Sequence, residues 1–171
     1  MRRTGETVFL SVLAADGRSM VYVDKVESGH IIRYAADVGD RRPLHATSSG
    51  KALLAFLPVG QRERTLKAVT LARHTERTET SLSALRATLA EIQRTGVCVS
   101  VDEFASGAAG VAAPIFDRDG RVAGVCAVGG PTDRLRPRVR TLTADVKRTA
   151  TTISAQLGHR TSDQHPAWRS S

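Results

Sequence analysis

The stretch that decides the fold is Glu6-Thr-Val-Phe-Leu-Ser-Val-Leu-Ala-Ala15, followed by Asp16-Gly17 and then by Arg18-Ser-Met-Val-Tyr-Val-Asp-Lys-Val-Glu27. The first run is rich in β-prone side chains, and the last run alternates apolar and polar residues, as strands with one buried face do. An Asp-Gly pair between two such runs is a strong hairpin signal because it tolerates the positive φ angles of a type I′ turn. We therefore predict two antiparallel strands joined by a tight turn.

The rest of the chain is predicted to alternate between strands and helices. A third strand is expected over residues 31–36, between two glycines. Beyond Pro43 the apolar spacing lengthens from two residues to about 3.6, which indicates helices. Helices are expected over residues 48–57, 59–69 and 82–95, strands over residues 97–101, 110–116 and 121–128, and a last helix over residues 137–157. This order predicts a mixed sheet with helices on its faces, the α+β class.

The composition indicates a single domain. The chain has 171 residues, of which 41% are hydrophobic and 25% charged, as in ordinary globular proteins. No apolar run approaches the roughly 18–20 residues that cross a membrane, and the first residues do not resemble a signal peptide, so we expect a cytosolic protein without membrane association. A domain is expected over residues 1–158, and the polar residues 159–171 are expected to form a disordered tail.

The charge balance restricts the partners only loosely. The formal net charge is +8, which suits an acidic ligand, a nucleic acid or simple solubility. Basic residues gather on the predicted last helix, but aromatic residues are only 4% of the chain and none lies among them. Stacking on single-stranded nucleic acid is therefore not supported, and a solvated helix face is the preferred interpretation.

The segment Gly39-Asp-Arg-Arg-Pro-Leu-His-Ala-Thr-Ser-Ser-Gly-Lys51 carries the richest chemistry. Hydroxyls, a glycine and a lysine converge on the start of an apolar helix, whose unpaired N–H groups and positive dipole end favour an anion. Arg42 could add a guanidinium to pair with a carboxylate. The simpler interpretation is that Thr47 or Ser48 only caps the helix. A pocket beside the helix start would favour the anion site.

Two alternatives involve covalent chemistry. Ser48-Ser-Gly-Lys51 matches the Ser-x-x-Lys pattern of penicillin-recognising serine enzymes, but the companion motifs of those enzymes are absent. Cys98 and Cys126, the only cysteines, exclude a disulfide framework but leave open a thiol-based redox sensor. Both alternatives stay open at this point.

Metal and cofactor sites have no support in the sequence. The five histidines are scattered, without a His-x-x-x-His or Cys-x-x-Cys pair. A phosphate-binding loop is excluded because Ala52 follows Lys51 where that motif needs Ser or Thr. We expect no metal and no cofactor.

Several spaced motifs resemble one family. Pro43-Leu-His-Ala-Thr-Ser-Ser-Gly-Lys-Ala-Leu-Leu-Ala55, then Gly107, Val111-Ala-Ala-Pro-Ile-Phe-Asp117 and the segment from Val125 to Pro131 are similar to the effector-binding domain of IclR-family transcriptional regulators. The resemblance runs over about residues 4–157. It implies a GAF-like fold, with a mostly antiparallel six-stranded sheet flanked by helices.

The resemblance also implies a function that is not enzymatic. A small organic acid would bind in a cleft on one face of the sheet and shift a homo-oligomer, a dimer or tetramer, so that operator binding changes. Full-length relatives carry an N-terminal winged helix-turn-helix, and this chain begins where that domain would end. We therefore expect DNA contact only through a helix-turn-helix domain that is not present in this chain.

The family's effector pocket maps onto residues spread along the sequence. By motif position it would be lined by Ile31, Tyr34, Arg42, Ser48, Ser49, Ser100, Gly110, Ala127 and Gly129. Three of these are Gly or Ala where relatives that bind small keto acids tend to carry larger or more polar side chains. A roomier, less polar cavity and a larger ligand such as an aromatic carboxylate are therefore expected. Its carboxylate would meet the helix start at Ser48 and Ser49, with Arg42 as a counter-charge and Tyr34 packing on the ring.

Overall fold

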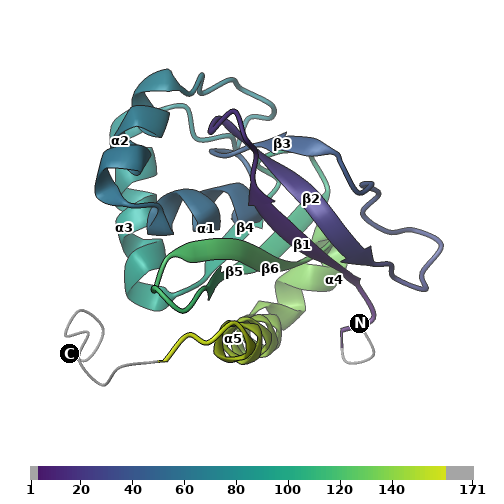
Figure 1. The fold of residues 1–171 in the computed structure, drawn as a ribbon. Helices are drawn as coiled ribbons and strands as arrows, with labels where there is room; N and C mark the ends of the chain where they lie inside the picture. The colour runs from purple at the N-terminus through teal and green to yellow at the C-terminus, as the bar shows by residue number, and fades with distance from the viewer. Residues whose placement is uncertain (1–3, 161–171) are drawn as a thin grey trace.

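A six-stranded antiparallel sheet with helices on both faces forms the centre of the structure, a computed structural model that describes residues 4–160 (Figure 1). The strand order is β3-β2-β1-β6-β5-β4. The strands are β1 (Thr7–Leu13), β2 (Ser19–Val26), β3 (Arg41–Pro43), β4 (Cys98–Val101), β5 (Ala108–Phe116) and β6 (Val122–Pro131). The helices are α1 (Ser48–Phe56), α2 (Val59–Ala68), α3 (Leu82–Thr95), α4 (Thr132–Leu135), the 3₁₀ turn η1 (Arg136–Arg138) and α5 (Val139–Gln156). The predicted α+β class and antiparallel six-stranded sheet are confirmed.

The predicted first hairpin is present, but its turn differs from the predicted type I′. β1 pairs antiparallel with β2. Only Gly17 of the Asp-Gly pair has a positive φ, +65°, whereas a type I′ turn needs two such residues. The loop instead closes through an Ala14 N–H to Ser19 carbonyl bond of 2.9 Å, and the Asp16 carboxylate accepts the Arg18 N–H at 2.8 Å. The Asp side chain thus stabilises a longer turn from within.

The predicted third strand is wrong. Residues 31–36 belong to an irregular segment, and the strand that pairs with β2 is the short β3. The segment of residues 27–40, the long connection between β2 and β3 in Figure 1, leaves Ile31 exposed and brings Tyr34 over the sheet. Of its β-prone residues, Tyr34 contacts the sheet face, whereas Ile31 and Ile32 are exposed.

Two apolar cores lie on opposite faces of the sheet. On one face α1 packs against alternate residues of β5 and β6, such as Ala112 and Val125, and α2 and α3 pack against α1. On the other face α4 and α5 pack against the residues between them, such as Val111 and Cys126. β5 and β6 are thus buried on both faces, which explains their nearly continuous runs of small apolar residues.

Helix α1 starts close to the backbone that precedes it. A Cβ on Gly50 would lie 2.6 Å from both the Cα and the carbonyl oxygen of Leu44 and 2.7 Å from the Pro43 oxygen. Only glycine allows this approach, because backbone atoms cannot move aside as a flexible side chain can. The close approach fixes the first turn of α1, with Ser48 and Ser49, against the sheet.

Candidate functional site

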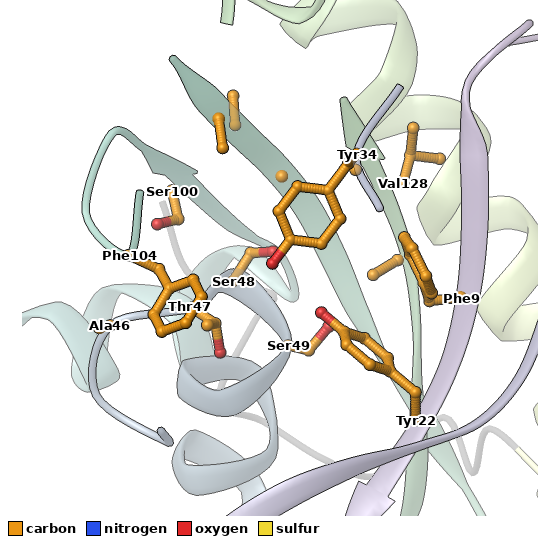
Figure 2. Close-up of a pocket in the computed structure, with 15 residues that line it drawn as sticks. Phe9, Tyr22, Tyr34, Ala46, Thr47, Ser48, Ser49, Ser100, Phe104 and Val128 are labelled. Atoms are coloured by element: carbon orange, nitrogen blue, oxygen red, sulfur yellow. The ribbon is translucent and has the colours of Figure 1, made fainter. Parts of the chain in front are cut away.

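A cavity lies between the first turn of α1 and the sheet (Figure 2). Its volume is about 50 Å³. It is lined by Phe9, Tyr22, Tyr34, Ala46, Thr47, Ser48, Ser49, Ser100, Phe104, Ala108, Ala109, Gly110, Ala127, Val128 and Gly129. The lining combines hydroxyls at a helix start, small residues on the strands and four aromatic rings.

The first turn of α1 presents polar groups to this cavity. Thr47 is the N-cap, and its Oγ1 accepts the Gly50 N–H at 3.0 Å and donates to the Pro43 carbonyl at 3.1 Å. Ser48 and Ser49 are buried, 7% and 3% exposed. Within residues 4–160, no hydrogen bond joins the hydroxyl or backbone N–H of either serine to another group. Donors that face a cavity at the positive end of a helix suit an anionic ligand.

The register of the sheet sets small residues opposite this turn. Ser100, Gly110 and Gly129 are directly paired neighbours across β4, β5 and β6. A Cβ on Gly110 would lie 2.5 Å from the Ser48 Oγ, and one on Gly129 would lie 3.3 Å from the Phe9 ring. These glycines therefore provide the room in which the serine hydroxyl and the aromatic ring lie.

Aromatic side chains form the remaining walls. The rings of Phe9 and Tyr22 are 4.6 Å apart, and Tyr34 meets Phe9 edge-on with 5.9 Å between ring centres. Figure 2 shows the hydroxyl ends of Tyr22 and Tyr34 pointing towards the first turn of α1, with Phe104 across from them. Burial, together with the neighbouring Tyr34, raises the pKa of Tyr22, so its phenol is neutral and can donate a hydrogen bond.

A buried ion pair holds the loop that carries Phe104. Lys51 on α1 reaches both carboxylate oxygens of Glu103, at 2.6 and 2.7 Å. Thr78 Oγ1 donates to the Glu103 carbonyl at 2.6 Å. These contacts fix the loop of residues 102–107 between β4 and β5 and thereby the position of the Phe104 wall.

Most of the residues assigned from the sequence meet at the cavity. Seven of the nine line it, namely Tyr34, Ser48, Ser49, Ser100, Gly110, Ala127 and Gly129. Ile31 does not, because its side chain points to solvent with 95% exposure. Sequence reasoning missed the walls Phe9, Tyr22 and Phe104.

Arg42 lies behind the aromatic walls and does not line the cavity. Its guanidinium carbon is 5.9 Å from the centre of the Tyr22 ring and 5.5 Å from that of Phe104. Its Nη2 donates to the Asp40 carboxylate at 2.9 Å, and its Nη1 to the Arg41 carbonyl. The guanidinium that was expected to pair with a ligand thus already forms an ion pair with the Asp40 carboxylate.

The cavity is also smaller than expected. Small-molecule pockets usually have about 300–1,000 Å³, against about 50 Å³ here. The small residues do open space over the strands, but the aromatic rings of Phe9, Tyr22, Tyr34 and Phe104 occupy much of it.

The geometry does not favour the covalent alternatives. Lys51 is paired with Glu103 and therefore does not serve as a free base for Ser48. Cys98 packs in the core beside α1, whereas Cys126 packs in the core beside α5, so the sheet separates the two thiols. Burial raises the pKa of both thiols to about 11, which makes them unreactive near neutral pH.

Two further features are absent from the part of the chain that the structure describes. No three His, Cys, Asp or Glu side chains among these residues gather in a way that could hold a metal ion. No helix within residues 4–160 has the length and apolar character required to span a bilayer. The predicted tail covers residues 159–171, of which residues 161–171 lie outside the described residues.

Comparison with known proteins identifies the family. Residues 1–155 match the family model for the C-terminal region of the bacterial transcriptional regulator IclR. The probable transcriptional regulator SauR of Cupriavidus necator is 38% identical over 133 residues, covering 78% of this chain and 52% of SauR. The chain thus spans about half the length of this relative.

Solved structures give the same result. The crystal structure of the Thermotoga maritima IclR protein superposes with a TM-score of 0.87 at 34% identity, covering 93% of this chain and 64% of that one. The inducer-binding domain of PobR from Acinetobacter, solved as a double mutant in complex with 3-hydroxybenzoic acid, gives 0.76 at 25% identity, covering 90% of each chain. Two further relatives, both from Escherichia coli, are the HTH-type transcriptional regulator KdgR and the transcriptional repressor IclR. The chain belongs to the IclR family of bacterial transcriptional regulators and corresponds to its C-terminal domain.

Proposed function

We propose that this domain senses a small organic acid, with an aromatic carboxylate as the preferred class, and controls DNA binding by the regulator to which it belongs. The observation that carries this proposal is the pair of buried serines at the start of α1. Ser48 and Ser49 present hydroxyls and N–H groups, without partners among residues 4–160, to a cavity with aromatic walls.

The carboxylate would be held by the start of α1. The Ser48 and Ser49 hydroxyls donate to its oxygens, and the positive end of the helix dipole lies behind them. A charge-assisted hydrogen bond of this kind contributes about 1.5–3 kcal/mol. Two such contacts are sufficient to make the site prefer acids over neutral molecules of the same shape.

The rest of the cavity favours a flat apolar body. Phe9 and Tyr22 supply ring faces and edges, and Ala127 and Gly129 leave room against the strands. Aromatic pairs contribute about 0.5–1.5 kcal/mol beyond the area that they bury. The PobR domain, bound to 3-hydroxybenzoic acid, supports the same ligand class for this fold.

Signalling requires a difference between two quaternary arrangements. A ligand that binds both equally shifts nothing, however tightly it binds. We propose that the domain forms a dimer or tetramer in the complete regulator and that the acid favours one arrangement. Several relatives are described as HTH-type regulators, and DNA contact is proposed to occur through such a domain.

A thermal-shift screen tests the sensor function. Benzoate, hydroxybenzoates, phenylacetate, acetate and pyruvate would each be added to the purified chain. A ligand present at about 100 times its Kd stabilises the folded state by about 2.7 kcal/mol, a readily measured rise in Tm. We expect rises with aromatic acids, and a flat response to all acids would refute the proposal.

Two variants test whether the carboxylate binds at Ser48 and Ser49. The double variant Ser48→Ala with Ser49→Ala removes both hydroxyls, and Ser83→Ala removes an exposed hydroxyl on α3 as the control. The thermal shift should disappear in the double variant and persist in the control. Equal shifts in all three proteins would show that the acid binds elsewhere.

A further inference from the structure

The position of Tyr34 explains the small volume of the cavity. Its ring lies over Gly129, where a Cβ would be 3.6 Å from the Tyr34 ring, and meets the Phe9 ring edge-on. Among the cavity residues, Tyr34 is the one that comes from the irregular segment of residues 27–40. With that ring in place the cavity holds about 50 Å³.

The segment that carries Tyr34 has few apolar anchors. Ile31 and Ile32 are 95% and 73% exposed. The segment is held instead by polar contacts, with Lys25 Nζ donating to the Ala36 carbonyl at 3.0 Å and Arg134 Nη2 donating to the Ile32 carbonyl at 2.8 Å. Few buried apolar contacts are a feature of a segment that opens at low cost.

Arg134 connects this segment to the start of the sheet. Its Nε and Nη2 donate to the two carboxylate oxygens of Glu6, at 2.7 and 2.8 Å, while Nη2 also reaches the Ile32 carbonyl. Glu6 is 1% exposed and directly precedes β1. This arginine pairing lowers the pKa of Glu6 and keeps the carboxylate charged. One guanidinium therefore joins the cover of the cavity to the residue that leads into the first strand.

We propose that Tyr34 is a displaceable plug, and that the ring of an aromatic acid takes the place of the Tyr34 ring between Phe9 and Gly129. Displacement of Tyr34 moves residues 30–36 away from the sheet and breaks the bond between Ile32 and Arg134, while Ser28 stays bonded to Gly5 and Asp40 to Tyr22. The effector thereby changes the anchoring of Glu6 at the entry to β1. This inference rests on the proposed sensor function, to which it adds the event that binding triggers.

Removing the plug should strengthen binding. If the displaced conformation makes up about 1–10% of the population, the apparent affinity is reduced by that fraction. Tyr34→Ala should then bind benzoate about 10- to 100-fold more tightly than the wild type, as measured by titration calorimetry. Ile31→Ala is the matched control, since it shortens an exposed side chain of the same segment outside the cavity. If Tyr34→Ala binds benzoate equally or more weakly while the wild type binds it, Tyr34 is a wall and the plug is refuted.

A neutral probe separates this test from the sensor proposal. Phenol has a ring but no carboxylate, so its binding does not depend on an acid site. If the plug is correct, ligand-observed NMR detects phenol binding to Tyr34→Ala and much less to the wild type, even if no acid binds either protein. An absence of phenol binding to a folded Tyr34→Ala would overturn the plug.

Hydrogen exchange tests the movement in the wild type without any variant. Benzoate should speed amide exchange in residues 30–36 and slow it at residues 48–50. Slower exchange in both regions would mean that the segment closes over the ligand, which contradicts displacement. This readout holds even if Tyr34→Ala does not fold.

Discussion

Replacing Lys51 by methionine should destabilise the domain strongly. Lys51 is 3% exposed, and its partner Glu103 has a side chain that is 15% exposed. Met fills a similar volume but leaves the carboxylate without a counter-charge. Removing one partner of a buried ion pair costs about 3–5 kcal/mol. For a domain of this size each kcal/mol lowers Tm by about 2–4 °C, so the expected loss is roughly 6–20 °C.

Urea unfolding, followed by circular dichroism, measures this effect. The midpoint should fall while the slope m stays constant, which shows that native stability and not compactness has changed. The double variant Lys51→Met with Glu103→Leu is the matched control. It should recover most of the loss, because an apolar pair avoids the cost of burying charge. A loss below about 1 kcal/mol in Lys51→Met would mean that the pair behaves as a solvent-exposed one, and would refute the view that it fixes the Phe104 loop.

Three further predictions follow from buried groups. Burial lowers the pKa of His45, so at low pH the unfolded chain takes up a proton that the folded chain excludes. The free energy of unfolding should therefore fall as pH drops from about 7 to 5, by at most about 1.4 kcal/mol per pH unit. Urea titrations at each pH should show a flatter dependence on pH for His45→Gln. A thiol-specific aromatic disulfide should not label Cys98 or Cys126 in the folded protein at pH 7, but it should label both in urea. Rapid labelling of the folded protein would contradict their burial. Gly50→Ala should cost at least about 2 kcal/mol, because its methyl would overlap the Leu44 backbone, and an unchanged urea midpoint would show that α1 can move away.

The sequence predicted those parts of the fold whose signals are local. The first hairpin was visible from its alternation and Asp16-Gly17, and α3 from its apolar spacing and the Ser81 cap, which accepts the Ala84 N–H. The third strand was not predictable in this way. Residues 31–36 are β-prone, but their conformation depends on Arg134, about a hundred positions later in the chain. The actual β3 has three residues, too few to show a period.

The candidate site was predicted only in part, because some of its residues show a local pattern and others meet only through long-range contacts. The start of α1 combines Ser48, Ser49 and Gly50 within one turn, a local pattern that any reader of the sequence can see. Phe9 reaches the cavity only because β1 pairs with β6, which sets it opposite Ala127, a long-range register that residue periodicity does not reveal. Phe104 lies in an irregular loop with no period at all. Arg42 was expected at the cavity, and its pairing with the Asp40 carboxylate depends on side-chain conformation that the sequence does not show.

Titration calorimetry with benzoate and benzamide tests the central claim most directly. The two probes share shape and ring, and only benzoate carries the charge that the start of α1 is proposed to bind. A contact contributing 1.5–3 kcal/mol corresponds to a roughly 10- to 150-fold preference for benzoate, and Ser48→Ala with Ser49→Ala should abolish that preference. Equal affinity of the wild type for both probes, or a preference that survives in the double variant, would contradict a carboxylate sensor built on these two serines.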